Sequence, residues 1–122
     1  MTKMTKLTAL AIALLSSTGA MAMSVEDYTL DKKSLTGQTV SVTGSPACLS
    51  GELCYLYSTD DGRINAMVSV VFDPSALPRE DRKKLLSCNP FSNPCDATIT
   101  ITGSTALFGA KAKSIAWGQP QG

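Results

Sequence analysis

Four cysteines are the residues whose spacing most narrowly limits the chemistry open to this chain. Cys48 and Cys54 are separated by five residues, and Cys88 and Cys95 by six. Structural zinc sites more often space their cysteines by about two to four residues and commonly add histidine, and this chain has no histidine. Redox pairs are more often Cys-x-x-Cys. The spacing therefore favours disulfide bonds over a metal site or a redox switch.

Three pairings of four cysteines are possible from sequence alone. We expect Cys48–Cys54 and Cys88–Cys95, because each pair is close in sequence and flanked by turn-forming residues. On chain-entropy arguments a loop this short contributes about 2.5 kcal/mol, against about 4 kcal/mol for a longer link such as Cys48–Cys88. Proximity, and not energy, is therefore the reason for preferring the local pairing.

Carboxylates are the remaining candidates for acid–base chemistry, because His-based triads are excluded. The densest group is Asp60-Asp61, which falls at a predicted turn. Calcium loops need several oxygen ligands at set spacing, so we interpret this pair as a solvated hairpin tip. No phosphate-binding glycine loop and no nucleophilic serine stands out. We therefore predict a protein that is not an enzyme and that uses no metal or cofactor.

Aromatic side chains offer a binding surface instead. Tyr55 and Tyr57 alternate along one predicted strand, and Arg63 opens the next. Such rings and a guanidinium can stack on a sugar or a base, although a tyrosine or Phe72 could equally fill the protein interior. Phe91 lies inside the second cysteine loop, CNPFSNPC. There it is either a preorganised anchor for a partner or a cover for the interior.

The N-terminus predicts export. Lys3 and Lys6 precede an apolar run over residues 7–15, and a small-x-small pattern ends at Ala22. This layout is typical of a cleavable signal peptide over residues 1–22. A membrane helix would need about 20 apolar residues, and the polar residues 16–18 interrupt the run too early. We expect a periplasmic or secreted protein, in which an even number of cysteines is typical of disulfides.

The mature chain, residues 23–122, is close to neutral. Without Lys3 and Lys6, nine basic residues stand against ten acidic ones. Such a chain lacks the positive field that attracts nucleic acid, so we do not expect a nucleic-acid partner. The basic run REDRKK, residues 79–84, holds two acids and is interpreted as a solvated helix face of mixed sign. No further apolar run is long enough to span a membrane, and the length suits one domain.

Hydrophobic patterning predicts five strands and one helix. The third strand has the longest alternation and should bury one face, and the fourth should point Ile99 and Ile101 inward. A helix over Pro78–Ser87 has proline and acids early and bases late. The predicted strands lie near residues 39–43, 52–58, 63–73, 96–109 and 110–118, and the inward face of the third comprises Ile64, Ala66, Val68, Val70 and Phe72.

This order of elements matches the OB-fold, a partly open five-stranded Greek-key barrel. We therefore predict an all-β chain with one short helix between strands three and four, where it closes one end of the barrel. The barrel would cover residues 35–117, after a polar lead-in over 23–34 and before a flexible tail over 118–122. OB barrels bind ligands across strands two and three, where Tyr55, Tyr57 and Arg63 are expected.

Two segments carry a resemblance to known proteins. LTGQTVSVTG resembles the opening strand of exported bacterial OB-fold families, including the tRNA-anti-like and BOF groups, and ATITITGSTALFGAKAKSIAW resembles their closing strand pair. The resemblance covers residues 35–117 and implies a fold, not RNA binding; the four cysteines lie outside the general pattern. The matching residues are Leu35, Gly37, Val40, Val42, Gly44, Ile99, Ile101, Gly103 and Ile115.

We thus expect a small exported binding protein of the bacterial envelope, whose partner is a protein, a peptide or a glycan. One alternative is an oligomeric glycan-binding subunit similar to the OB-fold B subunits of secreted toxins, which would form a ring in solution. A second alternative is a small carboxylate-dependent envelope enzyme. That enzyme would need a cleft containing a carboxylate of raised pKa.

Overall fold

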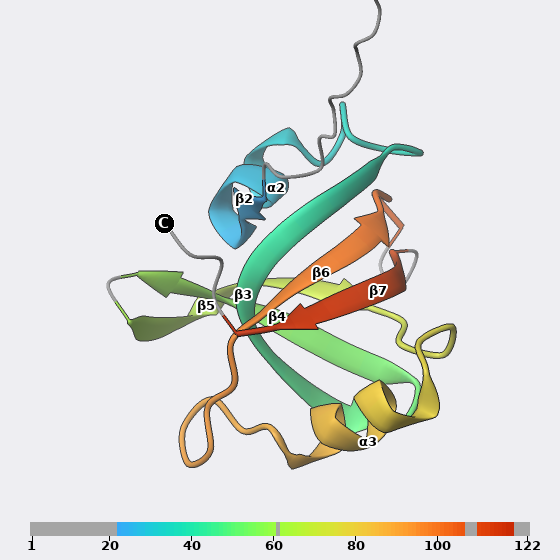
Figure 1. Cartoon of the computed structure of the whole chain (residues 1–122). Helices are drawn as coiled ribbons and strands as arrows, with labels where there is room; N and C mark the ends of the chain where they lie inside the picture. Colours follow the sequence, from blue (N-terminus) through green and yellow to red (C-terminus); the bar gives the residue numbers. More distant parts are fainter. Residues whose placement is uncertain (1–21, 61, 107–109, 119–122) are drawn as a thin grey trace, which may run out of the picture.

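The computed structural model describes residues 22–60, 62–106 and 110–118 (Figure 1). Within these ranges the chain is mostly β, with an antiparallel sheet and two helices. Residues 1–21 of the predicted signal peptide, Asp61 and residues 119–122 of the predicted tail lie outside the description. The elements are β2 (Met23–Ser24), α2 (Val25–Asp31), β3 (Thr39–Ser50), β4 (Leu53–Asp60), β5 (Arg63–Phe72), α3 (Arg79–Ser87), β6 (Ala97–Thr102) and β7 (Lys111–Trp117).

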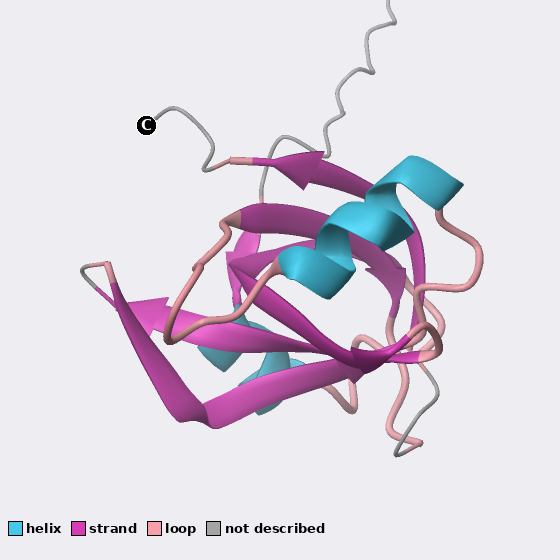
Figure 2. Ribbon diagram, turned by 90° about the horizontal axis from the view of Figure 1, so that it is seen from below, coloured by secondary structure: helices cyan, strands magenta, loops and turns pink. Residues whose placement is uncertain are grey.

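The sheet has β3 at its centre, in the order β5-β4-β3-β6-β7. All pairs on this path are antiparallel, and β2 adds a short parallel pair at the edge of β3. β3 pairs with β6 over residues 39–44 and with β4 over residues 45–50. An isolated parallel bridge between Asp73 and Lys111 joins the residue after β5 to the start of β7. The two ends of the strand path are thereby brought together (Figure 2).

Gly44 lies where β3 changes partners. A Cβ atom at this position would lie 2.5 Å from the backbone oxygen of Tyr57 and 3.0 Å from the side chains of Leu56 and Val25. Real Cβ atoms do not approach a backbone oxygen so closely, so this close passage of strands requires glycine. The glycine therefore lets a single long strand take part in both halves of the sheet.

The core lies inside the curved sheet and follows the predicted alternation for most strands. Ile99 and Ile101 of β6 point inward, as predicted. On β5 the predicted inward face is wrong for the first half of the strand, where Ala66 is exposed. The register of β4 and β5 shifts after Tyr57, and the outer part of this hairpin extends away from the rest of the sheet (Figure 1). Of the predicted inward residues of β5, Val70 and Phe72 are buried.

The predicted lead-in over residues 23–34 is wrong, and so is the prediction of a single helix, because α2 forms here. The Ser24 hydroxyl caps this helix by accepting a hydrogen bond from the backbone N–H of Asp27 at 3.0 Å. Val25 and Tyr28, one turn apart, are both fully buried. The Tyr28 hydroxyl accepts a hydrogen bond from the backbone N–H of Ser104 at 3.1 Å. This segment is therefore part of the core.

The predicted helix is confirmed as α3, which begins at Arg79 directly after Pro78 and buries Leu85. Two disulfides accompany it in the pairing favoured from the sequence. Cys48–Cys54 joins directly opposed residues of β3 and β4, and Cys88–Cys95 closes the loop after α3. Such bonds indicate an oxidising compartment outside the cytoplasm. Among the described residues no helix has the length and hydropathy to cross a membrane.

Candidate functional site

Tyr55 and Tyr57 lie on the outer face of β4. Their neighbours Cys54, Leu56 and Ser58 point inward and are buried, whereas both tyrosines are half-buried. The two rings lie within 13° of parallel, with centroids 6.0 Å apart. The gap between them is too narrow to admit a third ring, so a ligand would contact the outward surface of the pair. Tyr55 and Tyr57 therefore do not fill the interior. The large aromatic side chains buried in the core are Tyr28 and Phe72.

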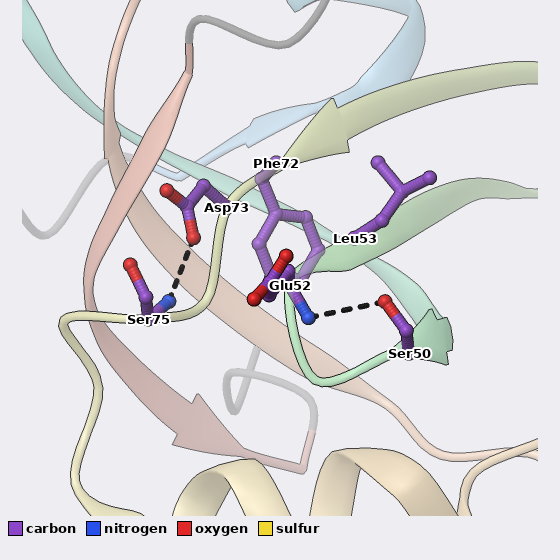
Figure 3. Close-up of a pocket in the computed structure, with 6 residues that line it drawn as sticks. All are labelled: Ser50, Glu52, Leu53, Phe72, Asp73 and Ser75. Carbon is purple, nitrogen blue, oxygen red and sulfur yellow. Dashed lines mark hydrogen bonds between the residues drawn. The ribbon is translucent and has the colours of Figure 1, made fainter.

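The tyrosine face leads into an open pocket. Leu53 shares the face of Tyr55 and Tyr57 by strand alternation, and it also lines a pocket of about 580 Å³ between the β3–β4 turn and the end of β5. Figure 3 shows this pocket with the carboxylates of Glu52 and Asp73 in it. The six lining residues are Ser50, Glu52, Leu53, Phe72, Asp73 and Ser75.

Hydrogen bonds shape the turn that carries Glu52 and hold the carboxylate of Asp73 in place. The backbone N–H of Glu52 donates to the Ser50 hydroxyl at 3.2 Å, which shapes the turn. Asp73 accepts a hydrogen bond from the backbone N–H of Ser75 at 2.8 Å. This bond lowers the pKa of Asp73, with help from the Ser75 side chain and the charge of Lys111, and against a smaller effect of burial. Asp73 therefore stays ionised at neutral pH.

The direction of that pKa shift bears on the enzyme alternative, which would need a carboxylate of raised pKa. Asp73 has a lowered pKa and so does not supply one. The described part of the chain also holds no group of three or more His, Cys, Asp or Glu side chains placed to bind a metal ion. What the pocket offers is a pair of carboxylate hydrogen-bond acceptors beside an aromatic surface.

Arg63 lies apart from the tyrosines. It is exposed opposite Asp60 at the end of the β4–β5 hairpin, three residues beyond Tyr57 and thus about 10 Å along the strand. Asp60 is exposed as well, as expected for a hairpin tip. The structure therefore does not bring the predicted arginine to the predicted aromatic pair.

Phe91 lies in a third place, in the loop after α3, and its side chain is 75% exposed. Its backbone N–H donates to the Asn89 side chain at 2.8 Å. The alternative that its ring covers the interior is therefore wrong. Of the four predicted binding residues, the structure groups only Tyr55 and Tyr57, and it adds Glu52 and Asp73, which the sequence analysis missed.

A signal for these two acids was present in the sequence. Glu52 opens the second predicted strand, and Asp73 ends the third. Antiparallel strands of a hairpin place the start of one beside the end of the other, and the structure pairs Cys54 with Phe72. The predicted hairpin therefore implied that both carboxylates lie at one edge of the sheet.

Comparison with known proteins assigns no family. No family model matches the chain, and no curated protein matches it. Among solved structures, it is similar to a protein described as an aspartyl-tRNA synthetase from Leishmania major Friedlin, with a TM-score of 0.49 and 12% identity over 89% of this chain. The chain spans 23% of that protein. This similarity carries no argument about function.

Proposed function

We propose that the mature chain is an exported, non-enzymatic OB-type binding protein of the bacterial envelope, periplasmic or secreted, and that it binds a glycan across β4 and β5. The strand order, with α3 between β5 and β6 and a parallel bridge from β5 to β7, supports a Greek-key barrel of this type. The disulfides and the signal-like N-terminus support export.

One observation carries the choice of ligand: the outer face of β4 runs from two parallel tyrosines, past Leu53, into a pocket with two carboxylates. A sugar has apolar C–H faces that pack on aromatic rings and hydroxyl groups that donate hydrogen bonds. Carboxylate oxygens are strong acceptors for such donors. OB barrels also use this face for oligosaccharides.

Charge narrows the class of glycan. Glu52 and the ionised Asp73 contribute two negative charges to the pocket, against the single positive charge of Lys111 beside Asp73. Phosphate groups would be repelled there, which disfavours nucleic acid and phosphorylated glycans. The pocket is therefore suited to neutral sugars and to sugars that carry an amino group.

The test is retention of the mature protein on a panel of immobilised neutral and amino-sugar oligosaccharides, followed by calorimetry with an oligosaccharide that retains it. Tyr55→Ala and Tyr57→Ala should each weaken binding by about 5- to 100-fold, as expected for loss of one stacked ring. Lys113→Ala, at an exposed position of β7, is the control and should bind as the wild type does.

Two results would contradict this function: no retention on any oligosaccharide, or equal affinity of the tyrosine variants and the wild type. Glu52→Gln distinguishes the two sugar classes, because loss of the charge should weaken amino sugars more than neutral ones. The oligomeric alternative shares the glycan but requires a ring. Light scattering of the mature protein separates the two, and a monomeric mass removes the ring.

A further inference from the structure

Helix α3 presents a stripe of cations at the end of the barrel that it covers. Arg79, Arg82 and Lys83 fall within an arc of about 100° around the helix axis, together with Leu86. These four residues and Gly51 of the β3–β4 turn line a pocket of about 280 Å³. We call these three cations with Leu86 the α3 stripe.

The acids of α3 do not share this stripe. Asp81 accepts a hydrogen bond from the indole N–H of Trp117 at 3.0 Å, on the side of the helix that faces β7. Lys84 lies on that side too, 4.4 Å from the centre of the Trp117 ring. Glu80 lies about 60° around the helix from Lys83, between the α3 stripe and Lys84. In the segment that the sequence suggested to be of mixed sign, the three cations of the stripe therefore lie together, whereas Asp81 and Lys84 lie on the side that contacts Trp117.

Exposed apolar side chains lie in the α3 stripe and in the segments next to it, the end of β3 before the β3–β4 turn and the loop after α3. Leu86 is 57% exposed, and Leu49, two residues before Gly51 in the sequence, is 73% exposed. Phe91, at 75%, is carried by the closed loop that follows α3. The Asn93 side chain ties this loop to the helix end by donating to the Ser87 carbonyl at 2.8 Å. In the view from below the barrel, α3 and its connections face the reader (Figure 2).

We propose that the α3 stripe, with Leu49 and Phe91, is a docking surface for a membrane containing anionic phospholipid. The charge of the stripe is complementary to such a surface, and each cation near it strengthens binding by about fivefold. Leucine and phenylalanine side chains add affinity by entering the interface between headgroups and acyl chains. The disulfide-closed loop already restrains Phe91, so little conformational entropy is lost when it inserts.

This docking surface and the proposed glycan site are lined by different residues, although both include the β3–β4 turn. Gly51 lines the pocket of the stripe, whereas Ser50 and Glu52, on either side of it in the chain, line the pocket of the glycan site. Glu52 and Glu80 oppose the attraction to anionic lipid, and the three cations of the stripe outnumber them. A protein docked in this way would keep Tyr55 and Tyr57, on the outer face of β4, open to a soluble glycan.

The first experiment is co-sedimentation of the mature protein with vesicles of phosphatidylcholine alone and of phosphatidylcholine with phosphatidylglycerol. Binding should require phosphatidylglycerol and should fall as sodium chloride is raised, because salt screens exposed charges. The proposal is overturned if the protein fails to bind phosphatidylglycerol vesicles at low salt. Equal binding to both kinds of vesicle would overturn it as well.

Matched variants then locate the surface. Arg79→Gln with Lys83→Gln should weaken binding by about 25-fold, whereas Lys33→Gln with Lys113→Gln removes the same charge elsewhere and should have little effect. Leu49→Ser with Phe91→Ser should weaken binding, whereas Leu30→Ser with Met67→Ser, at side chains 81% and 92% exposed, should not. Equal losses within either matched set would overturn the proposal. Circular dichroism verifies that each variant is folded.

Tyr55→Ala distinguishes this proposal from the proposed glycan site. This variant should bind vesicles as the wild type does, even if it no longer binds glycan.

Discussion

Two serine hydroxyl groups in the interior of the protein should reduce its stability. The oxygens of Ser45 and Ser58 are buried, and neither has a hydrogen-bond partner among the described residues. A buried polar group without a partner costs about 1–3 kcal/mol. We therefore expect Ser58→Ala to raise the free energy of unfolding by about 1 kcal/mol, measured by urea denaturation of the oxidised protein.

A third serine provides the matched control for this prediction. The Ser41 hydroxyl is hydrogen-bonded to that of Thr100 at 3.0 Å across β3 and β6. Ser41→Ala should lower the free energy of unfolding by about 1 kcal/mol, because it breaks that bond. The prediction is contradicted if the two alanine variants change stability in the same direction.

The lowered pKa of Asp73 predicts how the free energy of unfolding depends on pH. Because the folded state holds this pKa below its ordinary value of 3.8, Asp73 contributes stability above that value, and the contribution is lost as pH falls through the folded-state pKa. Asp73→Asn should therefore reduce the difference in unfolding free energy between pH 7 and pH 2.5. Denaturation series at several pH values measure this difference, and an unchanged difference would contradict the assignment.

Among the elements, β3 depends on a single residue where it changes partners. Gly44→Ala should lower the free energy of unfolding by about 1–3 kcal/mol, because the added methyl group would meet the Tyr57 backbone. Gly51→Ala is the matched control, since a Cβ there meets nothing within 4 Å. Thermal unfolding of both variants measures the effect. Equal stability of the two would show that β3 adjusts at this position.

Helix α2 yields a second prediction about an element. Tyr28→Phe removes the acceptor of the Ser104 N–H and should cost about 1 kcal/mol, whereas Tyr28→Ala also empties a core position and should cost about 3–5 kcal/mol. Hydrogen exchange at the Ser104 amide should accelerate in both variants. A protein that loses nothing in Tyr28→Ala would restore the interpretation of residues 23–34 as a lead-in.

An element could be predicted from the sequence when its own residues form a clear pattern of apolar and polar side chains. β6 alternates threonine with Ile99 and Ile101, so its inward face was plain from the sequence. Helix α2 spans only seven residues, and its apolar pair Val25 and Tyr28 stands in a polar segment. Its stability comes from docking on the sheet, which no local pattern reports. The local signs of a helix were the cap at Ser24 and the acids Glu26 and Asp27 in the first turn, and these signs are weak by themselves.

At the scale of the whole molecule, the two proposed binding surfaces could likewise be predicted only in part from the sequence. The tyrosine pair was predictable because strand alternation places residues i and i+2 on one face. Placing Asp81 outside the α3 stripe required knowing which side of α3 contacts Trp117, and these two residues are far apart in the sequence. Arg63 was misplaced because the hairpin turn pairs it with Asp60, three residues beyond Tyr57. Local alternation therefore located the tyrosine pair, whereas strand pairing and a contact between distant residues placed Arg63 and Asp81.

The two disulfides should supply a substantial part of the free energy of unfolding of the whole molecule. The two disulfides close short loops, with sequence separations of 6 and 7 residues, and each should contribute about 2–3 kcal/mol by restricting the unfolded chain. A domain of about this size has a total stability of roughly 5–15 kcal/mol. We therefore expect Cys48→Ala with Cys54→Ala, and Cys88→Ala with Cys95→Ala, each to remain folded.

The quadruple variant should lose about 4–6 kcal/mol, close to the sum of the two losses, because one bridge links β3 to β4 and the other closes a loop after α3. Urea denaturation of the three variants and of the oxidised wild type gives all four free energies. The fully reduced wild type should match the quadruple variant to within the packing difference between cysteine and alanine. A quadruple variant as stable as the oxidised wild type would contradict this prediction, because the fold would then lose no stability when both disulfides are removed.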